Sequence, residues 1–135
     1  MSELLFVYGT LKSGESNHNI LECCSPTLVS KTVESFPKFT LLDLGAYPAV
    51  IKTGNTSIHG EVYEIGDLSS IDILEGHPQF YYREQFPFIL WPNHRVNCWM
   101  YTLRDYQKYV APTQKNVIEE GNWSRHARRN RKIRI

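Results

Sequence analysis

The fold of this chain is most constrained by a series of short β-type runs that turn signals keep apart. In each run, β-branched, aromatic and other apolar residues dominate or alternate with polar ones, and Gly, Pro or Asn stands between the runs. Seven runs fit this description: Leu4–Tyr8, Thr27–Val33, Phe39–Leu44, Tyr47–Lys52, Ser57–Ile65, Tyr81–Leu90 and Arg95–Leu103. Only residues 17–22 and 66–78 have helical character. Many strands with few short helices predict an α+β fold, a small mixed β-barrel that is closed or nearly closed.

The order of the runs along the chain predicts two hairpins. Gly54-Asn55 is a plausible tight turn between residues 47–52 and 57–65. Residues 91–94 separate the last two runs in the same way. The first run, Leu4–Tyr8, is apolar throughout, which indicates a strand that is buried on both faces.

Length and composition indicate one globular domain. A chain of 135 residues can bury most of its surface, and 41% hydrophobic with 21% charged residues is ordinary for a globule. No apolar run approaches the roughly 18 residues of a membrane span, and Met1-Ser2-Glu3 does not resemble a secretory signal. Three cysteines, two of them adjacent, indicate reduced thiols that serve packing. We therefore expect a cytoplasmic protein without membrane contact.

The end of the chain differs in charge from the rest. Six of the 15 Lys and Arg residues lie in residues 125–135, which contain no acid. We therefore divide the chain into a domain over residues 1–124 and a basic C-terminal tail over residues 125–135. Such a tail can attract nucleic acid or acidic partners, but this one has no aromatic residue on which bases could stack. The simpler expectation is a solvated terminus.

Residues 66–78 have both of the signals that mark the ends of a helix. Asp67 suits the N-cap, because its carboxylate can accept hydrogen bonds from free amides of the first turn. Gly76 suits the left-handed position after the last turn, and Pro78 cannot continue the helix.

Glu75 lies on the apolar face of this helix. At 100° per residue, Leu68, Ile71 and Leu74 form one stripe, and Glu75 falls within it. Glutamate is seldom buried without a partner, so its carboxylate could pair with Arg83 or reach solvent at a frayed helix end. Alternatively, burial and the negative end of the helix dipole raise the pKa of this carboxyl, which would suit a general base.

Several separated motifs together resemble one family. In chain order they are Tyr8-Gly9-Thr10-Leu11-Lys12 with Gly14 and Asn17-His18, Tyr47-Pro48-Ala49-Val50, Gly60-Glu61-Val62-Tyr63, Leu74-Glu75-Gly76 with Tyr81 and Arg83, Tyr101, and Gly121-Asn122-Trp123. On these residues the chain, over roughly residues 4–124, resembles the gamma-glutamylcyclotransferase-like family and looks most like its gamma-glutamylamine cyclotransferase branch. The opening block and the Leu-Glu-Gly segment are the most specific of these motifs.

The resemblance implies roles for particular residues. It assigns the acid/base to Glu75, and it assigns the loop that binds the substrate's glutamyl head to Tyr8, Gly9, Thr10 and Leu11. Glycine lets a backbone approach a ligand closely, and successive amides form an anion-binding concavity. Gly9 could equally be required because the strand must bend there.

Three further tyrosines are candidates for the substrate pocket. The hydroxyl groups of Tyr47, Tyr81 and Tyr101 would orient the substrate, although core packing is the commoner role of tyrosine in so aromatic a chain. The chain departs from the family pattern at Asn122, where many relatives carry an acid.

The reaction that the resemblance implies is intramolecular. The α-amino group of a γ-glutamyl amine or amino acid attacks the γ-carbonyl, forms 5-oxoproline and releases the free amine, which makes the protein a cyclising transferase or lyase. Because nucleophile and electrophile are already tethered, we expect no cofactor. We expect no metal either, since the histidines lack the spacing of zinc ligands. The expected partner is a small γ-glutamyl substrate. The alternative function is a non-catalytic module of the same fold that binds γ-glutamyl compounds or other carboxylates.

Overall fold

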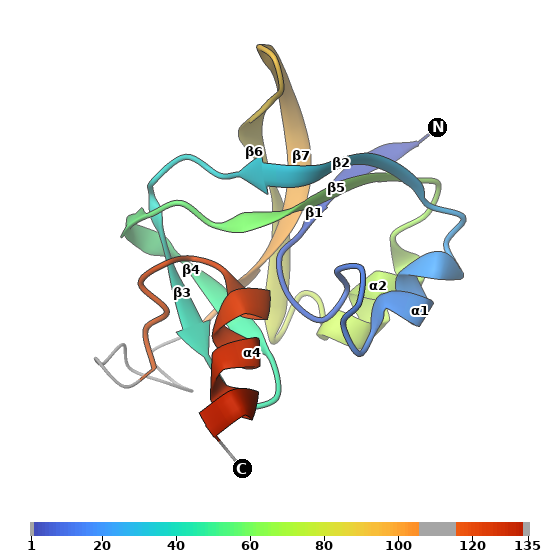
Figure 1. Ribbon diagram of the computed structural model, residues 1–135. Coiled ribbons are helices and arrows are strands. Elements are labelled where there is room, and N and C mark those ends of the chain that lie inside the picture. Colours follow the sequence, from blue (N-terminus) through green and yellow to red (C-terminus); the bar gives the residue numbers. More distant parts are fainter. Residues whose placement is uncertain (1, 106–115, 134–135) are drawn as a thin grey trace.

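The structure is a computed structural model that describes residues 2–105 and 116–133 (Figure 1). Its strands are β1 (Glu3–Val7), β2 (Thr27–Glu34), β3 (Phe39–Asp43), β4 (Pro48–Thr56), β5 (His59–Ile65), β6 (Tyr81–Leu90) and β7 (His94–Leu103). Its helices are α1 (His18–Glu22), α2 (Ser69–Glu75) and α4 (Trp123–Ile133). All seven predicted strands and both predicted helices are present within a few residues of their expected ends. The fold is mixed α+β, dominated by sheet, as predicted.

The larger sheet has five strands in the order β2-β5-β1-β7-β6, with β1 at its centre. β1 pairs antiparallel with β5 and parallel with β7, so the sheet is mixed. Its edge strands meet near one isolated bridge, between Ser35 after β2 and Phe88 of β6. One bridge does not close the sheet, so the predicted barrel is not confirmed.

A two-stranded antiparallel ribbon, β3-β4, forms the second sheet. The predicted hairpin between residues 47–52 and 57–65 is therefore wrong, because β4 pairs with β3 whereas β5 pairs with β1 and β2. Gly54 lies within β4 at φ 127°, and a Cβ there would stand 2.2 Å from the Oγ1 of Thr40. This glycine permits a close approach of two strands rather than a turn. The other predicted hairpin, β6-β7, is confirmed.

Strand β1 is buried on both faces, as its apolar sequence predicts. Leu5 and Val7 belong to one core cluster, together with Leu21 of α1 and Ile71 of α2. The alternate residue Phe6 belongs to a second cluster, which contains residues of β3, β4 and β6. Because successive side chains of a strand point to opposite faces, β1 contributes residues to both core clusters.

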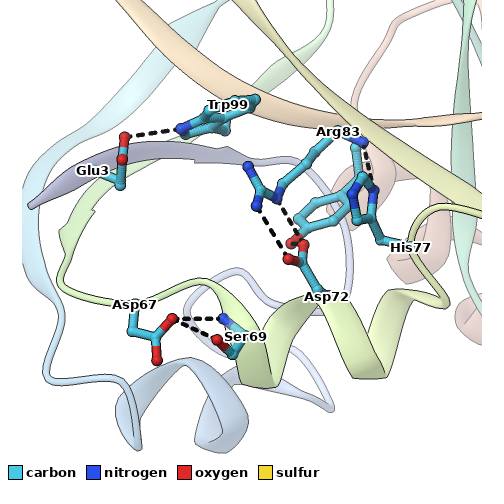
Figure 2. Close-up of polar contacts among 8 residues, drawn as sticks. Glu3, Asp67, Ser69, Asp72, His77, Arg83 and Trp99 are labelled. Atoms are coloured by element: carbon cyan, nitrogen blue, oxygen red, sulfur yellow. Dashed lines mark hydrogen bonds and ion pairs between the residues drawn. The ribbon is translucent and has the colours of Figure 1, made fainter.

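Helix α2 begins one residue later than predicted and ends where predicted. Its N-cap is Leu68, and the Asp67 carboxylate still accepts hydrogen bonds from the Ser69 amide, at 3.0 Å, and from the Ser69 hydroxyl (Figure 2). Gly76 takes the left-handed conformation, with φ 65°, directly after Glu75. No helix in the described part of the chain is long and apolar enough to cross a membrane.

The C-terminal segment is helical rather than a solvated tail as far as Ile133, and the boundary expected after Ser124 falls inside α4. Ala127 packs against the second core cluster. The His126 ring lies 2.8 Å from a carboxylate oxygen of Asp43, and Arg129 pairs with Glu120 at 2.7 Å. The strongly basic composition of residues 125–135 gave no indication in the sequence that these few residues contact the rest of the domain.

These contacts predict that a chain ending at Ser124 is less stable than the full chain. Removing the His126–Asp43 contact and the Ala127 packing should lower the free energy of unfolding by about 1–3 kcal/mol. Urea denaturation of both chains measures this difference. A chain ending at Arg129 keeps all three contacts and is the matched control. Equal stability of the Ser124-terminated and full chains would show instead that residues 125–135 are an independent tail.

Candidate active site

A pocket of about 450 Å³ opens where the loop after β1 meets the end of α2. All eight residues that the sequence nominated line this pocket: Tyr8, Gly9, Thr10, Leu11, Tyr47, Glu75, Tyr81 and Tyr101. They come from five separate segments of the chain, so the fold brings them together. Their roles in binding or catalysis stay predictions.

Glu75 is the only residue of the pocket lining with a carboxylate or a basic side chain. It is half-buried, and its carboxylate forms no hydrogen bond or ion pair with any other described residue. Because burial disfavours the ionised form, it raises the pKa of this carboxyl to about 7. The alternative of a pair with Arg83 is wrong, because Arg83 has another partner.

Arg83 pairs with Asp72, one turn before Glu75 on the same helix (Figure 2). The guanidinium donates two hydrogen bonds to the Asp72 carboxylate, at 2.7 and 3.2 Å, and the Tyr101 hydroxyl donates a third at 2.6 Å. Burial alone would raise the pKa of Asp72, but the hydrogen bonds from Arg83 and Tyr101 outweigh it and hold this pKa below its usual value. Arg83 also lies over the Trp99 ring, whose indole N–H donates to Glu3.

The loop after β1, which lines the pocket, has three amides that are not used in the protein. In the described structure, the backbone N–H groups of Gly9, Thr10 and Leu11 donate to no protein acceptor. Their carbonyls, in contrast, are used, since the Gly9, Thr10 and Leu11 oxygens bind Lys12 N, Asn17 N and the His18 ring respectively. Three successive free amides beside one pocket form a concavity suited to negative charge.

Asn17, directly before α1, and Glu61 of β5 hold this loop in place. The Asn17 side-chain amide donates to the Thr10 hydroxyl at 3.0 Å. Buried Glu61 accepts from the Ser13 amide at 2.9 Å and from the Tyr63 hydroxyl at 3.0 Å. Both residues lie in the motifs that carry the family resemblance, but sequence reasoning did not foresee that they support the loop.

The hydroxyl groups of three pocket tyrosines already donate to protein acceptors. Tyr8 donates to the Tyr101 carbonyl at 2.7 Å, and Tyr81 donates to the Pro48 carbonyl at 2.6 Å. Tyr101 donates to Asp72, as described above. Burial raises the pKa of each of these phenols, and the Glu75 charge contributes to all three shifts. Among the four tyrosines that line the pocket, only Tyr47, 40% exposed, has a hydroxyl without a hydrogen-bond partner in the described structure.

Gly9 is required by packing. A Cβ at this position would stand 2.7 Å from Cγ and 2.9 Å from Cδ of Pro48, which also lines the pocket. Its backbone is not in the left-handed region, so the constraint is space rather than φ. This supports the structural reading of Gly9, and a close approach of the backbone to substrate stays a prediction.

Further lining residues were not nominated from the sequence. They are Phe6, Val7, Ser16, Asn17, Ala46, Pro48, Ile73, Leu74, Gly76 and Phe80. Pro48, Leu74 and Gly76 stand inside the quoted motifs, so adjacency to nominated residues was an available signal. Phe80 likewise directly precedes nominated Tyr81, whereas Ile73 is next to no nominated residue, and only the folded chain brings it to the pocket.

No group of three His, Cys, Asp or Glu side chains in residues 2–105 and 116–133 is arranged to hold a metal ion. Cys23, Cys24 and Cys98 are free thiols, and Cys98 is buried.

The chain matches the family described as "Gamma-glutamyl cyclotransferase, AIG2-like" over residues 5–125, and it belongs to that family. It is 35% identical over 127 residues to a putative gamma-glutamylcyclotransferase of Vibrio cholerae, covering 91% of this chain and 96% of the relative. It is 32% identical over 137 residues to the gamma-glutamylaminecyclotransferase of Rattus norvegicus, covering 87% and 90%.

Solved structures agree with this family. An AIG2-like protein of Mus musculus superposes with a TM-score of 0.72 at 25% identity, covering 90% of this chain and 88% of that one. YkqA of Bacillus subtilis gives a TM-score of 0.74 at 25% identity over 98% of this chain. The chain spans 43% of the length of YkqA.

The raised pKa of Glu75 predicts a pH-dependent cost of burying its charge. Below about pH 4.5 the carboxyl is protonated in both folded and unfolded chains, whereas above pH 7 both are ionised and the folded state bears the penalty. Glu75→Gln should therefore be more stable than wild type by about 2–3 kcal/mol at pH 8.5 and nearly equal to it at pH 4.5. Urea denaturation at the two pH values measures the gap. A gap that does not change with pH would contradict the shift.

The contact at Gly9 predicts a specific pattern of stability. Gly9→Ala should lower the free energy of unfolding by about 1–3 kcal/mol, because its Cβ overlaps the Pro48 ring. Pro48→Ala removes Cγ and Cδ, so the double variant should lose less than the sum of the two single variants. Thermal unfolding of all four chains completes this cycle. Strict additivity would show that the Pro48 ring is not what excludes a side chain.

Proposed function

We propose that this chain is a cyclising enzyme that converts a γ-glutamyl amine into 5-oxoproline and the free amine. One observation carries the proposal: the partnerless Glu75 carboxylate, with its pKa raised to about 7, lines the same pocket as three free loop amides. A base with a pKa near the working pH and a concavity for negative charge are the two elements that this reaction requires.

The loop amides account for substrate binding. A γ-glutamyl compound carries a negatively charged α-carboxylate, and its γ-carbonyl oxygen becomes negative when the α-amino group attacks. The amides of Gly9, Thr10 and Leu11 can donate to either charge at no reorganisation cost, because Asn17 and Glu61 hold the loop.

Glu75 accounts for the proton transfers. As carboxylate it takes a proton from the attacking α-nitrogen, whose lone pair then forms the bond to the γ-carbon. As carboxylic acid it returns that proton to the departing nitrogen while the amide C–N bond breaks. The tethered geometry supplies the proximity, so one acid/base group suffices.

The charge of the pocket favours an amine over an amino acid as the leaving group. An amino acid or dipeptide would bring a second carboxylate, and the lining offers no cationic side chain to pair with it. Tyr47, Leu74 and Phe80 instead provide apolar surface. The rat relative, named a gamma-glutamylaminecyclotransferase, agrees with this choice.

The three free thiols support a reducing cytoplasmic location.

Replacement of the base should strongly lower turnover without unfolding the chain. Glu75→Gln is expected to lower kcat by about two to four decades, the usual contribution of a positioned acid/base. In wild type, kcat/KM should fall as the pH drops below about 7, since the attacking step needs the carboxylate. The assay follows 5-oxoproline release from γ-glutamyl amines, γ-glutamyl amino acids and glutathione.

Glu64→Gln, an exposed change on β5, is the matched control and should retain full activity. Full activity of Glu75→Gln on a substrate that wild type turns over would remove Glu75 from the mechanism. Tight binding of γ-glutamyl compounds with no 5-oxoproline from any of them would favour the alternative of a binding module.

A further inference from the structure

A second pocket, of about 290 Å³, is lined by Lys12 of the loop after β1 and by residues of β2 and β5. It shares no lining residue with the candidate active site. Its polar lining residues come from the loop, β2, β5 and the position just before α4: Lys12, Lys31, Thr32, Glu34, His59, Glu61 and Asn122. The proposed cyclisation leaves this pocket unused.

Lys12 is the unusual member of this lining. The residue is only 8% exposed, but its ammonium still reaches solvent, and this ammonium forms no hydrogen bond or ion pair with another residue of the described chain. Burial lowers the pKa of this amine, against the attraction of Glu61 and Glu15, while the positive charge of Arg128 lowers it further. The stem of Lys12 is packed in the pocket wall while its ammonium has no direct partner, so an anion that entered the pocket could bind it.

The acids nearest to Lys12 are already engaged elsewhere. Glu61 accepts from the Ser13 amide and the Tyr63 hydroxyl through the same oxygen. Glu15 accepts from the Ser124 hydroxyl at 2.8 Å. On the rim, Glu34 pairs with His59 at 3.0 Å. Each carboxylate therefore has a donor of its own, and neither Glu61 nor Glu15 lies within ion-pair distance of Lys12.

We propose that this second pocket binds a small oxyanion, a phosphate or a carboxylate, with buried Lys12 as its counter-charge. Asn122 supports the ion from α4: its side-chain oxygen accepts from the Arg125 amide at 3.1 Å, which leaves its NH₂ group to donate. Exposed Lys31 adds a second cation at the rim. An ion so bound would be held by charge and hydrogen bonds together.

The proposed site is directly connected to the first pocket through the backbone. Lys12 follows Leu11, and its amide donates to the Gly9 carbonyl at 3.1 Å. Ser13, the next residue, is fixed by Glu61 of the second pocket. An oxyanion on Lys12 would therefore rest against the back of the loop whose amides line the candidate active site.

Anion titrations of the full chain test the proposal without reference to activity. At constant ionic strength in chloride, saturating phosphate or acetate should raise the Tm by about 3 °C or more. The amide resonances of Lys12 and Gly60 should shift during the titration, while that of Gly76 at the other pocket should not. A response to phosphate alone identifies a phosphate site, and a response to acetate identifies a carboxylate site; both support the proposal.

Two variants and one control locate the effect. Lys12→Met keeps the length of the side chain and removes its charge, and Asn122→Asp places a carboxylate in the same pocket; each should weaken anion binding at least tenfold. Lys38→Met, at an exposed lysine outside the pocket, should bind as wild type does. Should Lys12→Met fail to fold, Asn122→Asp carries the test. Wild type without an anion response, or folded variants with an unchanged one, would overturn the proposal.

Discussion

The central position of β1 determines most of what this fold can do. Both of its backbone edges are paired, with β5 and β7, and both of its faces are buried in separate clusters. The chain can continue beyond Val7 only by leaving the sheet. The amides of the next residues, Gly9 to Leu11, therefore leave the hydrogen-bond ladder and become available to a ligand. Both edges of β1 are paired and both faces are buried, and the chain that leaves this strand forms the loop of the candidate active site.

Two carboxylates one turn apart on α2 are placed in opposite environments. Asp72 receives Arg83 and Tyr101, which hold its pKa low, whereas Glu75 faces an uncharged pocket that raises its pKa to about 7. Because the Arg83 guanidinium pairs with Asp72, it forms no ion pair with Glu75. The ion pair thus leaves the neighbouring carboxylate without a cationic partner.

Local patterns were enough to predict the strands and α2, because alternation and helix ends are properties of short segments. The eight pocket residues were nominated through the family resemblance, and only Glu75 was also indicated by its place on the helix. The predicted hairpin across Gly54 was wrong because glycine is typical both of turns and of places where two strands approach closely. The sequence alone does not distinguish these two cases, whereas the pairing of β4 with β3 places Gly54 against Thr40. Whether the sheet closes depends on how distant edge strands meet. The docking of α4 depends on Ala127 and His126, which a strongly basic sequence obscures.

The parallel pairing of β1 with β7 joins Leu5 to Trp99, across most of the chain. During synthesis on the ribosome, the first strand emerges long before β7 exists, so this parallel pairing has to wait for most of the chain. Contacts of such large sequence separation slow folding, because the intervening chain must lose its freedom first. Tyr8 and Tyr101 of the candidate site meet by the same closure. The pocket is therefore a late product of translation, and no N-terminal fragment that lacks β7 can contain it.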